Sequence, residues 1–269
     1  MARPWHEAVK CEAMKARFAS VLALLLCSAA GPAGAQAQID WVLVGNYRIA
    51  RTETTIGQFR RFVDATGVVT LAERRGGGEV YEAGWVQKQG WTWSAPFGPG
   101  YRPQDDEPAV HLAYDEAQAF CRWAGGRLPT DEEWLGAAYV ERRKTPPAPF
   151  VSGRRYAFPQ GDTPSGAQCL GDCGPQDRTR AVPHGVALAR GYGHSRVGST
   201  PPGVNGLYDM GGNAWEWVDE PRTAVGVAEK RTRGGSWWYG ARQMQADYLQ
   251  SKPKDTAVVY IGFRCARDP

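Results

Sequence analysis

Two carboxylates enclose a glycine-rich turn in the last third of the chain. Asp209 and Glu216 are seven residues apart, and Gly211 and Gly212 lie between them. Such a turn lets backbone carbonyls converge between the two carboxylates, and Ca²⁺ prefers this mixed set of hard oxygen donors at about 2.3–2.6 Å. The spacing therefore predicts a structural calcium site. The alternative is that both side chains only hydrogen-bond to the turn.

Cysteines are the second group of residues that could do chemistry. Beyond residue 35 the chain keeps an even set of four, Cys121, Cys169, Cys173 and Cys265. Four cysteines in an oxidising compartment favour two disulfides, for which three pairings exist. The short separation of Cys169 and Cys173 favours a local bridge, which leaves Cys121 to pair with Cys265. A redox-active pair at Cys169 and Cys173 is the alternative.

Histidines offer little for a transition-metal site. His111 lies in the strand-like sequence AVHLAY and is expected in the core. His184 and His194 lie in a loop segment, where we expect them to be solvated, and two histidines without a nearby carboxylate are weak grounds for a metal centre. Copper or iron is therefore the less favoured alternative to calcium as a cofactor.

Short helices, short strands and long loops must position these residues. Caps and apolar spacing predict three helices, which run from Thr54 or Thr55 to Asp64, from Tyr114 to Trp123, and onward from the capping box at Thr130. Alternation and β-branched residues predict strands at 40–52, 231–239 and 257–265. Two stretches, 67–108 and 142–203, are predicted to be loops, and the first of them is rich in aromatic residues.

Residues 1–35 have the pattern of a secretory signal peptide. Lys15 and Arg17 precede a short apolar run, and an Ala-Gly-Ala cleavage pattern ends the segment. Met14 is the expected translation start, because charged residues that are unusual in a leader precede it. We therefore expect a periplasmic or secreted protein with a single domain over 36–269. No later apolar stretch is long enough to insert stably into a membrane.

Composition limits the function classes further. The 269 residues are 42% hydrophobic and 22% charged, which excludes wholesale disorder and coiled coil. The net charge of +4 is small and spread along the chain, so a nucleic-acid partner is not expected. Many glycines and prolines beside 11 tryptophans indicate a turn-rich body held together by aromatic rings rather than a helical bundle.

Five segments carry long motifs, in this order: RTETTIGQFRRFVDATG at 51–67, PAVHLAYDEAQAFCRWAGGRLPTDEEW at 108–134, GLYDMGGNAWEW at 206–217, RGGSWW at 233–238 and IGFRCARD at 261–268. Together they resemble the formylglycine-generating enzyme family, also called sulfatase-modifying factors, over essentially all of 40–268. The resemblance implies an irregular α+β fold of the C-type-lectin kind, poor in regular secondary structure and dependent on calcium and disulfides.

The same resemblance implies specific site residues. The calcium ligands would be two side chains and two backbone carbonyls, namely those of Asp209 and Glu216 and of Gly212 and Ala214. A bridge between Cys121 and Cys265 is implied as well. The family's second calcium site falls in the segment 166–180, where Gln168 replaces the usual asparagine.

This chain departs from the family at the residues that define its reaction. Formylglycine generators carry two cysteines spaced C-x4-C after the glycine pair, and these soft thiolates bind copper(I) and activate oxygen to oxidise a sulfatase cysteine. Counting on from Gly235, the two positions here are Tyr239 and Met244. Neither is a thiol, so formylglycine generation on sulfatases is the least favoured function.

A substrate groove is the feature that the resemblance leaves in place. Its candidate residues are Trp215, Ser236, Trp238, Tyr239, Arg242 and Met244. Aromatic rings with a few polar groups suit a peptide, a sugar or an aromatic metabolite. Two function classes follow: an exported oxidative or tailoring enzyme that acts on a small molecule or peptide, or a non-catalytic module that binds a peptide, glycan or partner protein.

Overall fold

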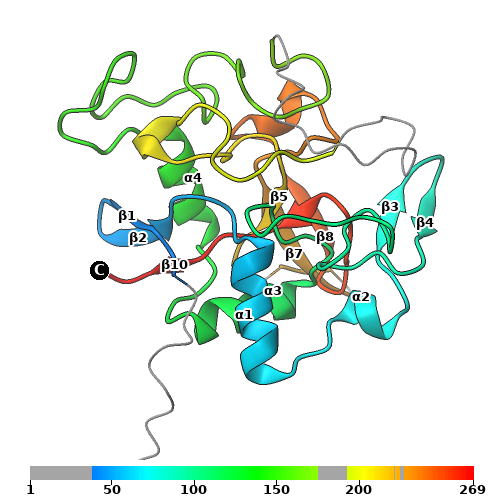
Figure 1. The fold of residues 1–269 in the computed structure, drawn as a ribbon. Helices are drawn as coiled ribbons and strands as arrows, with labels where there is room; N and C mark the ends of the chain where they lie inside the picture. The colour runs from blue at the N-terminus through cyan, green and yellow to red at the C-terminus, as the bar shows by residue number, and fades with distance from the viewer. Residues whose placement is uncertain (1–37, 175–192, 221, 225–226) are drawn as a thin grey trace, which may run out of the picture. The chain divides into compact units, whose positions relative to one another are not determined.

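The computed structural model describes residues 38–174, 193–220, 222–224 and 227–269 (Figure 1). The predicted signal peptide and His184 lie outside the described residues. The described residues belong to one compact unit that spans 34–269. Within them, no helix is both long and apolar enough to cross a bilayer.

A small antiparallel sheet joins the two ends of the described domain. Its strands are β1 (Trp41–Val44), β2 (Tyr47–Ala50) and β10 (Ala266–Arg267), in the order β1-β2-β10. Gly45 in the β1–β2 turn has φ +62°, a conformation that glycine adopts at little cost. The predicted strand at 40–52 is therefore a hairpin, and Ile49 pairs with Ala266 from the far end of the chain.

Three helices lie where the sequence predicts them: α1 (Ile56–Thr66), α3 (Tyr114–Trp123) and α4 (Asp131–Tyr139). Thr55 and Thr130 cap α1 and α4 through hydrogen bonds to the backbone three residues on, and both are capping boxes. α3 passes behind α1 in Figure 1, and the two helices contribute Phe120 and Phe59 to the core, with ring centroids 5.8 Å apart.

A second sheet lies behind α1 in the view of Figure 1. Its strands are β5 (Trp215–Trp217), β6 (Arg222–Ala224), β7 (Val227–Arg233), β8 (Gln250–Pro253) and β9 (Ile261–Gly262). β7 pairs antiparallel with β5, β6 and β8, whereas β5 pairs parallel with β9. Two short 3-10 turns, η1 (Val204–Gly206) and η2 (Ala241–Met244), lie in the loops, and η1 contacts α4.

The predicted strands at 231–239 and 257–265 are shorter in the structure. β7 ends at Arg233 because Gly234 and Gly235 have φ +98° and +75°, which turns the chain out of the sheet. A Cβ atom at Gly234 would lie only 2.8 Å from the carbonyl oxygen of Met210, so this close approach requires glycine.

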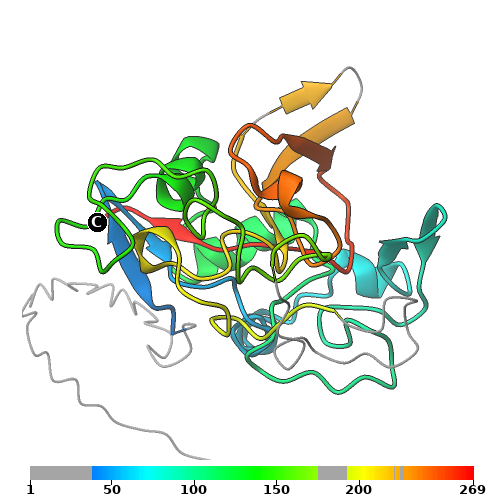
Figure 2. The same ribbon diagram turned by 90° about the horizontal axis from the view of Figure 1, so that it is seen from above.

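The prediction that 67–108 is entirely loop is wrong. The segment contains α2 (Leu71–Arg74) and a hairpin of β3 (Glu79–Tyr81) and β4 (Trp85–Gln87). Figure 2 shows this hairpin extending outward, away from β1 and β2. Aromatic and β-branched residues fit a pleated strand, and this preference outweighs the many flanking turn residues.

Both predicted disulfides are present. Cys121 on α3 is bonded to Cys265 just before β10, with Cα atoms 5.5 Å apart, and it lies in the main aromatic core. Cys169 is bonded to Cys173, with Cα atoms 6.2 Å apart. The first bridge links distant parts of the chain, and the second closes a short loop.

Candidate functional site

Buried charges surround the glycine-rich turn at 209–216. Glu216, on β5, accepts hydrogen bonds from the Arg264 guanidinium at 2.7 Å on each carboxylate oxygen and a further one from Trp134 Nε1 at 2.7 Å. Arg264 and Glu216 are both fully buried. A bidentate pair of this kind fixes both side chains in one geometry.

Two more carboxylates lie in the same buried region. Asp209, with φ +57°, accepts hydrogen bonds from the Gly198 amide at 2.7 Å and the Thr200 hydroxyl at 2.5 Å. Glu53, which precedes α1, accepts hydrogen bonds from the Ala214 amide at 2.9 Å and from Asn213 Nδ2 at 2.6 Å. We call Glu53, Asp209, Glu216 and Arg264 the buried charge cluster.

The buried charge cluster has more negative than positive groups. Burial raises the pKa of Glu53 well above its usual range, and the negative charges of Asp209 and Glu216 raise it further. Burial also raises the pKa of Asp209, against the hydrogen bonds from Thr200 and Gly198. Arg264 is the cation that lowers both of these pKa values, and one guanidinium does not balance three carboxylates.

The predicted calcium ligands fit a hard cation in donor type and in charge. Within the described residues, the carbonyl oxygens of Gly212 and Ala214 accept no hydrogen bond, while Asp209 and Glu216 supply carboxylates. A divalent cation would offset the excess negative charge. The three carboxylates are not a tight cluster, however. Among the described His, Cys, Asp and Glu side chains, one group of three has its possible ligand atoms within 4.8 Å of one another. That group is Cys169, Asp172 and Cys173, and it contains none of the three carboxylates.

A pocket of about 490 Å³ lies between the β3–β4 hairpin and the chain after the glycine pair. It is lined by four aromatic and two charged side chains, Tyr81, Glu82, Trp85, Trp238, Tyr239 and Lys252. We call it the aromatic pocket. Trp238 stacks on Tyr260 with centroids 5.7 Å apart, and Tyr239 meets the same ring edge-on at 5.5 Å. The buried Tyr260 therefore holds both rings at the pocket wall.

The structure brings only two of the six predicted groove residues, Trp238 and Tyr239, into this pocket. Trp215, Ser236 and Met244 are buried and do not line this pocket, so their assignment to a groove stays a prediction. Trp215 is a core residue because β5 is paired on both edges. Arg242 is exposed, but its guanidinium forms an ion pair with Asp247 at 2.8 Å.

The Cys169–Cys173 loop packs directly against the same segment. The Leu170 amide donates to the carbonyl oxygen of Tyr239 at 2.9 Å, and Asp172 accepts from the Ala241 amide at 2.7 Å. Met244 packs in one apolar cluster with both cysteines. The disulfide therefore fixes the backbone that carries Tyr239.

His194 differs from the prediction that it is solvated. It is fully buried, its Nε2 lies 3.0 Å from a Glu107 carboxylate oxygen, and its ring stacks on Phe97 at 5.1 Å. The hydroxyl of Tyr101 donates to the same carboxylate at 2.7 Å. Burial acts to raise the pKa of Glu107, but the hydrogen bond and charge of His194, together with hydrogen bonds from the Gln104 amide and Tyr101, lower this pKa below its usual value.

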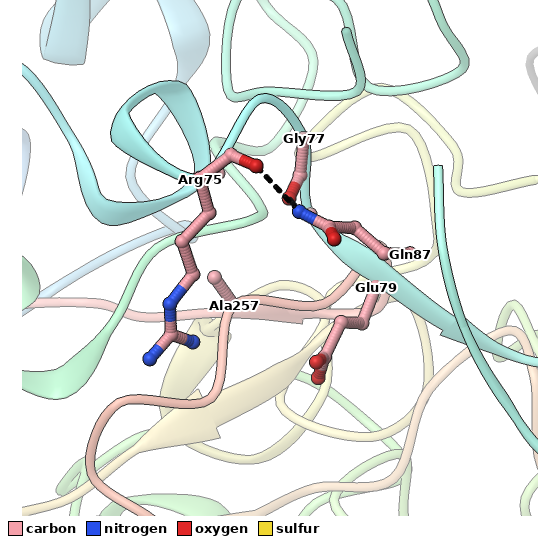
Figure 3. A pocket seen from close by; sticks show the side chains of 7 residues that line it. Arg75, Gly77, Glu79, Gln87 and Ala257 are labelled. Carbon is pink, nitrogen blue, oxygen red and sulfur yellow. Dashed lines mark hydrogen bonds between the residues drawn. The ribbon is translucent and has the colours of Figure 1, made fainter. Parts of the chain in front are cut away.

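A smaller hollow of about 240 Å³ lies at the base of the hairpin (Figure 3). Gln87 Nε2 donates to the carbonyl oxygens of Arg75 at 2.6 Å and Gly77 at 3.1 Å. The Arg75 guanidinium in turn forms an ion pair with Asp255 at 2.9 Å. These polar groups bind one another, so the hollow is a weaker candidate for a ligand than the aromatic pocket.

Sequence reasoning missed two residues of the buried charge cluster, Glu53 and Arg264, and four of the aromatic pocket, Tyr81, Glu82, Trp85 and Lys252. Glu53 and Arg264 lie inside the first and last motifs, in the sequences RTETT and GFRC. The motifs therefore contained both residues but gave no indication of their role. Trp85 and Lys252 had no signal, because only the packing of the hairpin beside β8 brings them to one pocket.

Comparison with known proteins gives a consistent picture. The formylglycine-generating enzyme of Thermomonospora curvata is 31% identical over 88% of this chain and 87% of its own length. Two solved structures share the fold. PvdO from Pseudomonas aeruginosa has a TM-score of 0.55 and 22% identity, and the match covers 83% of this chain and 80% of PvdO. CarF has a TM-score of 0.58 and 20% identity, and the match covers 87% of this chain and 99% of CarF. The sulfatase-modifying factor enzyme 1-like domain matches residues 29–269. The chain therefore belongs to this formylglycine-generating enzyme family.

Proposed function

We propose that the protein is a tailoring enzyme that binds a small molecule or peptide in the aromatic pocket and oxidises it, with O2 as the electron acceptor, without a copper–thiolate centre. The observation that carries the proposal is the position of Tyr239, which lines the pocket at the place where the resemblance puts the first cysteine of formylglycine generators. The second position, Met244, is buried beside the Cys169–Cys173 disulfide. The substrate pocket is therefore kept, and the pair of thiols is missing from it.

The residues of the pocket support binding and proton transfer. Trp238 and Tyr239 offer flat apolar surface, and the Tyr239 hydroxyl lies 3.4 Å from the Tyr260 hydroxyl. A phenol can donate or accept a hydrogen bond at a reacting group. All four cysteines of the described residues are in disulfides, so none of them offers the thiolate pair that copper(I) selects. We therefore propose that sulfatases are not its substrates.

A direct assay tests both parts of this proposal. Wild-type protein, incubated aerobically with reductant, with or without copper, should leave the mass of a sulfatase-motif cysteine peptide unchanged. With extracts of small metabolites and peptides, mass spectrometry should find a product that has lost hydrogen or gained oxygen. Tyr239→Phe should abolish that product while its circular dichroism spectrum stays unchanged. Turnover of the sulfatase peptide by the wild-type protein would overturn the proposal.

The donor set and charge of the buried charge cluster support a structural calcium ion. Asp209, Glu216 and the carbonyls of Gly212 and Ala214 would hold it, and its positive charge would offset the carboxylates in that cluster. Calcium that binds only the folded state stabilises by mass action, about 2.7 kcal/mol at a hundredfold excess over Kd.

Chelation tests the calcium proposal. Excess EGTA should lower the melting temperature of the wild-type protein, and added Ca²⁺ should restore it. Asp209→Asn should lose this response while the Arg264–Glu216 pair stays intact. An unchanged melt in EGTA, with no calcium retained by the purified protein, would contradict the site.

Export is part of the proposed function. The resemblance of residues 1–35 to a signal peptide and the two disulfides both favour an oxidising compartment. Cell fractionation of the native host should recover a chain that begins near residue 36 outside the cytoplasm. A full-length chain in the cytosol would contradict export.

A specific observation also favours a second candidate, a non-catalytic binding module. The titratable groups that line the aromatic pocket are Tyr81, Glu82, Tyr239 and Lys252, and this set contains no histidine or thiol. Such a pocket can bind a peptide, glycan or partner protein without chemistry. Recovery of a bound ligand that is chemically unchanged after aerobic incubation would support this second function.

A further inference from the structure

Lys252 has an unusual position at the aromatic pocket. It lies on β8, and together with Trp85 it lines both this pocket and an adjoining one of about 450 Å³. Its ammonium group lies 5.4 Å from the centre of the Trp85 ring. Among the described residues Lys252 forms no ion pair, and the carboxylate that acts on it, Glu229, does so only at longer range. A half-buried cation is therefore left without a close counter-ion.

Two of the rings that line the pocket with Lys252 are more exposed than the other described aromatic residues. Trp85 is 50% exposed and Tyr81 46% exposed, and the two pack edge to face at 5.5 Å on the hairpin. Large exposed aromatic side chains that gather at a pocket mark a recognition surface. The hairpin therefore presents flat apolar surface to the pocket, and Trp238 and Tyr239 add to it.

The acidic group of the pocket does not neutralise Lys252. The carboxylate of Glu82 accepts a hydrogen bond from Lys88 at 2.9 Å, so its charge is paired within the hairpin. The net electrostatic character of the aromatic pocket is therefore set by the ammonium group of Lys252. Electrostatic complementarity then selects a ligand with a negative group.

We propose that the aromatic pocket takes a planar ring that bears a carboxylate, with the ring against Trp85, Trp238 and Tyr239 and the carboxylate on Lys252. This inference rests on the proposed function, which makes this pocket the substrate site. It adds the class of substrate: an aromatic acid, either as a free metabolite or as part of a larger molecule.

Titration calorimetry with matched probes tests the inference. Indole-3-acetate and indole-3-acetamide have the same ring and nearly the same shape, and they differ in charge. The acid should bind the wild-type protein at least about tenfold more tightly than the amide, because a charge-assisted hydrogen bond is stronger than a neutral one. Lys252→Gln should remove the preference while binding of the amide stays within about twofold.

A nearby lysine gives a matched control. Lys254 lies two residues further along the chain, is half-exposed, and already forms an ion pair with Asp115 at 2.7 Å. Lys254→Gln removes the same charge outside the pocket, so it should keep the preference for the acid. If Lys254→Gln lowers the preference as much as Lys252→Gln does, long-range charge explains the effect and the inference is wrong.

The remaining outcomes separate this inference from the proposed function. Equal affinity for the acid and the amide in the wild-type protein, with both lost in Trp85→Ala, would overturn the role of Lys252 and leave the pocket as the binding site. Binding of the acid that is unchanged in Trp85→Ala would show that the ligand binds elsewhere, which would overturn the inference and remove the support for the pocket as the substrate site. No binding of either probe at millimolar concentration would overturn the inference alone.

Discussion

The buried charge cluster and the aromatic pocket treat charged groups in opposite ways. In the cluster, each carboxylate oxygen of Glu53, Asp209 and Glu216 accepts a hydrogen bond from within the protein, and water is excluded. In the pocket, Lys252 is only half-buried and has no close counter-ion among the described residues.

This difference shows that the fold uses its buried polar groups to join distant segments, whereas the polar group at the pocket faces a possible ligand. The cluster joins the segment before α1, the turn at 209–216 and the chain before β10, which are far apart in the sequence. Removing one member would leave a buried charge without its partner, which is costly. In the pocket, Tyr81, Trp85 and Lys252 lie on a projecting hairpin and an edge strand, so these side chains can change without loss of the core. One region specifies the fold, and the other is free to specify a ligand.

The largest expected effect on stability is the loss of the Cys121–Cys265 disulfide, which lies in the core, compared with the loss of the Cys169–Cys173 disulfide, which lies beside the pocket. In the chain-entropy model, closing a loop of 144 residues stabilises by about 5 kcal/mol and closing one of four residues by about 2 kcal/mol. Replacing both Cys121 and Cys265 with alanine should therefore lower the free energy of unfolding far more than replacing Cys169 and Cys173. Urea denaturation measures both, and equal losses would contradict this ranking.

Breaking the buried ion pair is the next largest change. Arg264→Met removes the guanidinium and leaves Glu216 buried without its cation, which should cost about 3–5 kcal/mol. The control is Arg60→Gln, because Arg60 pairs with Asp105 at the surface and should change stability by about 1 kcal/mol or less. If both variants unfold at the same urea concentration, the cluster does not specify the fold.

A pH titration tests a buried group at the base of the hairpin. Burial lowers the pKa of His111 from 6.5 to about 4, since both ring nitrogens are enclosed by protein. Between pH 6.5 and 4, the unfolded chain therefore binds a proton at His111 that the folded chain does not bind. The contribution of His111 to the free energy of unfolding is fully present above pH 6.5 and decreases by about 3 kcal/mol as the pH falls to 4.

His111→Asn isolates this contribution. His111 has φ +59°, a conformation that asparagine also tolerates, so the variant keeps the backbone. The free energy of unfolding of the variant should depend less on pH between 6.5 and 4 than that of the wild-type protein. An identical slope in both proteins would show that other groups cause the acid sensitivity.

The smallest effect on stability is expected in the pocket itself. Trp85 is half-exposed at the tip of the hairpin, and exposed positions outside the core usually change stability by about 0.5 kcal/mol or less. Trp85→Ala should therefore melt within a degree or two of the wild-type protein while it weakens binding of aromatic ligands. A large loss of stability would make the hairpin part of the core and remove the contrast between the two regions.

Local signals in the sequence predict much of the fold. Thr55 and Thr130 have the side chains that cap a helix, and α1 and α4 begin directly after them. The spacing of the four cysteines leads to the two bridges that form. The β3–β4 hairpin is missed because Gly76, Gly77 and Gly78 resemble a loop, whereas they pass beneath the hairpin at close contact with Lys88 and His111.

By itself, the sequence determined the family, the helices, the disulfides and the absence of thiols at positions 239 and 244, because these depend on residue type and on neighbours within a few positions. Only the tertiary structure decided which polar groups are buried and which face a pocket. Glu53 meets the turn at 209–216 from more than 150 residues away, His194 is enclosed beside Glu107, and Lys252 has no close counter-ion among the residues that the structure describes. Burial and pairing depend on contacts between distant segments, and no local pattern in the chain encodes them.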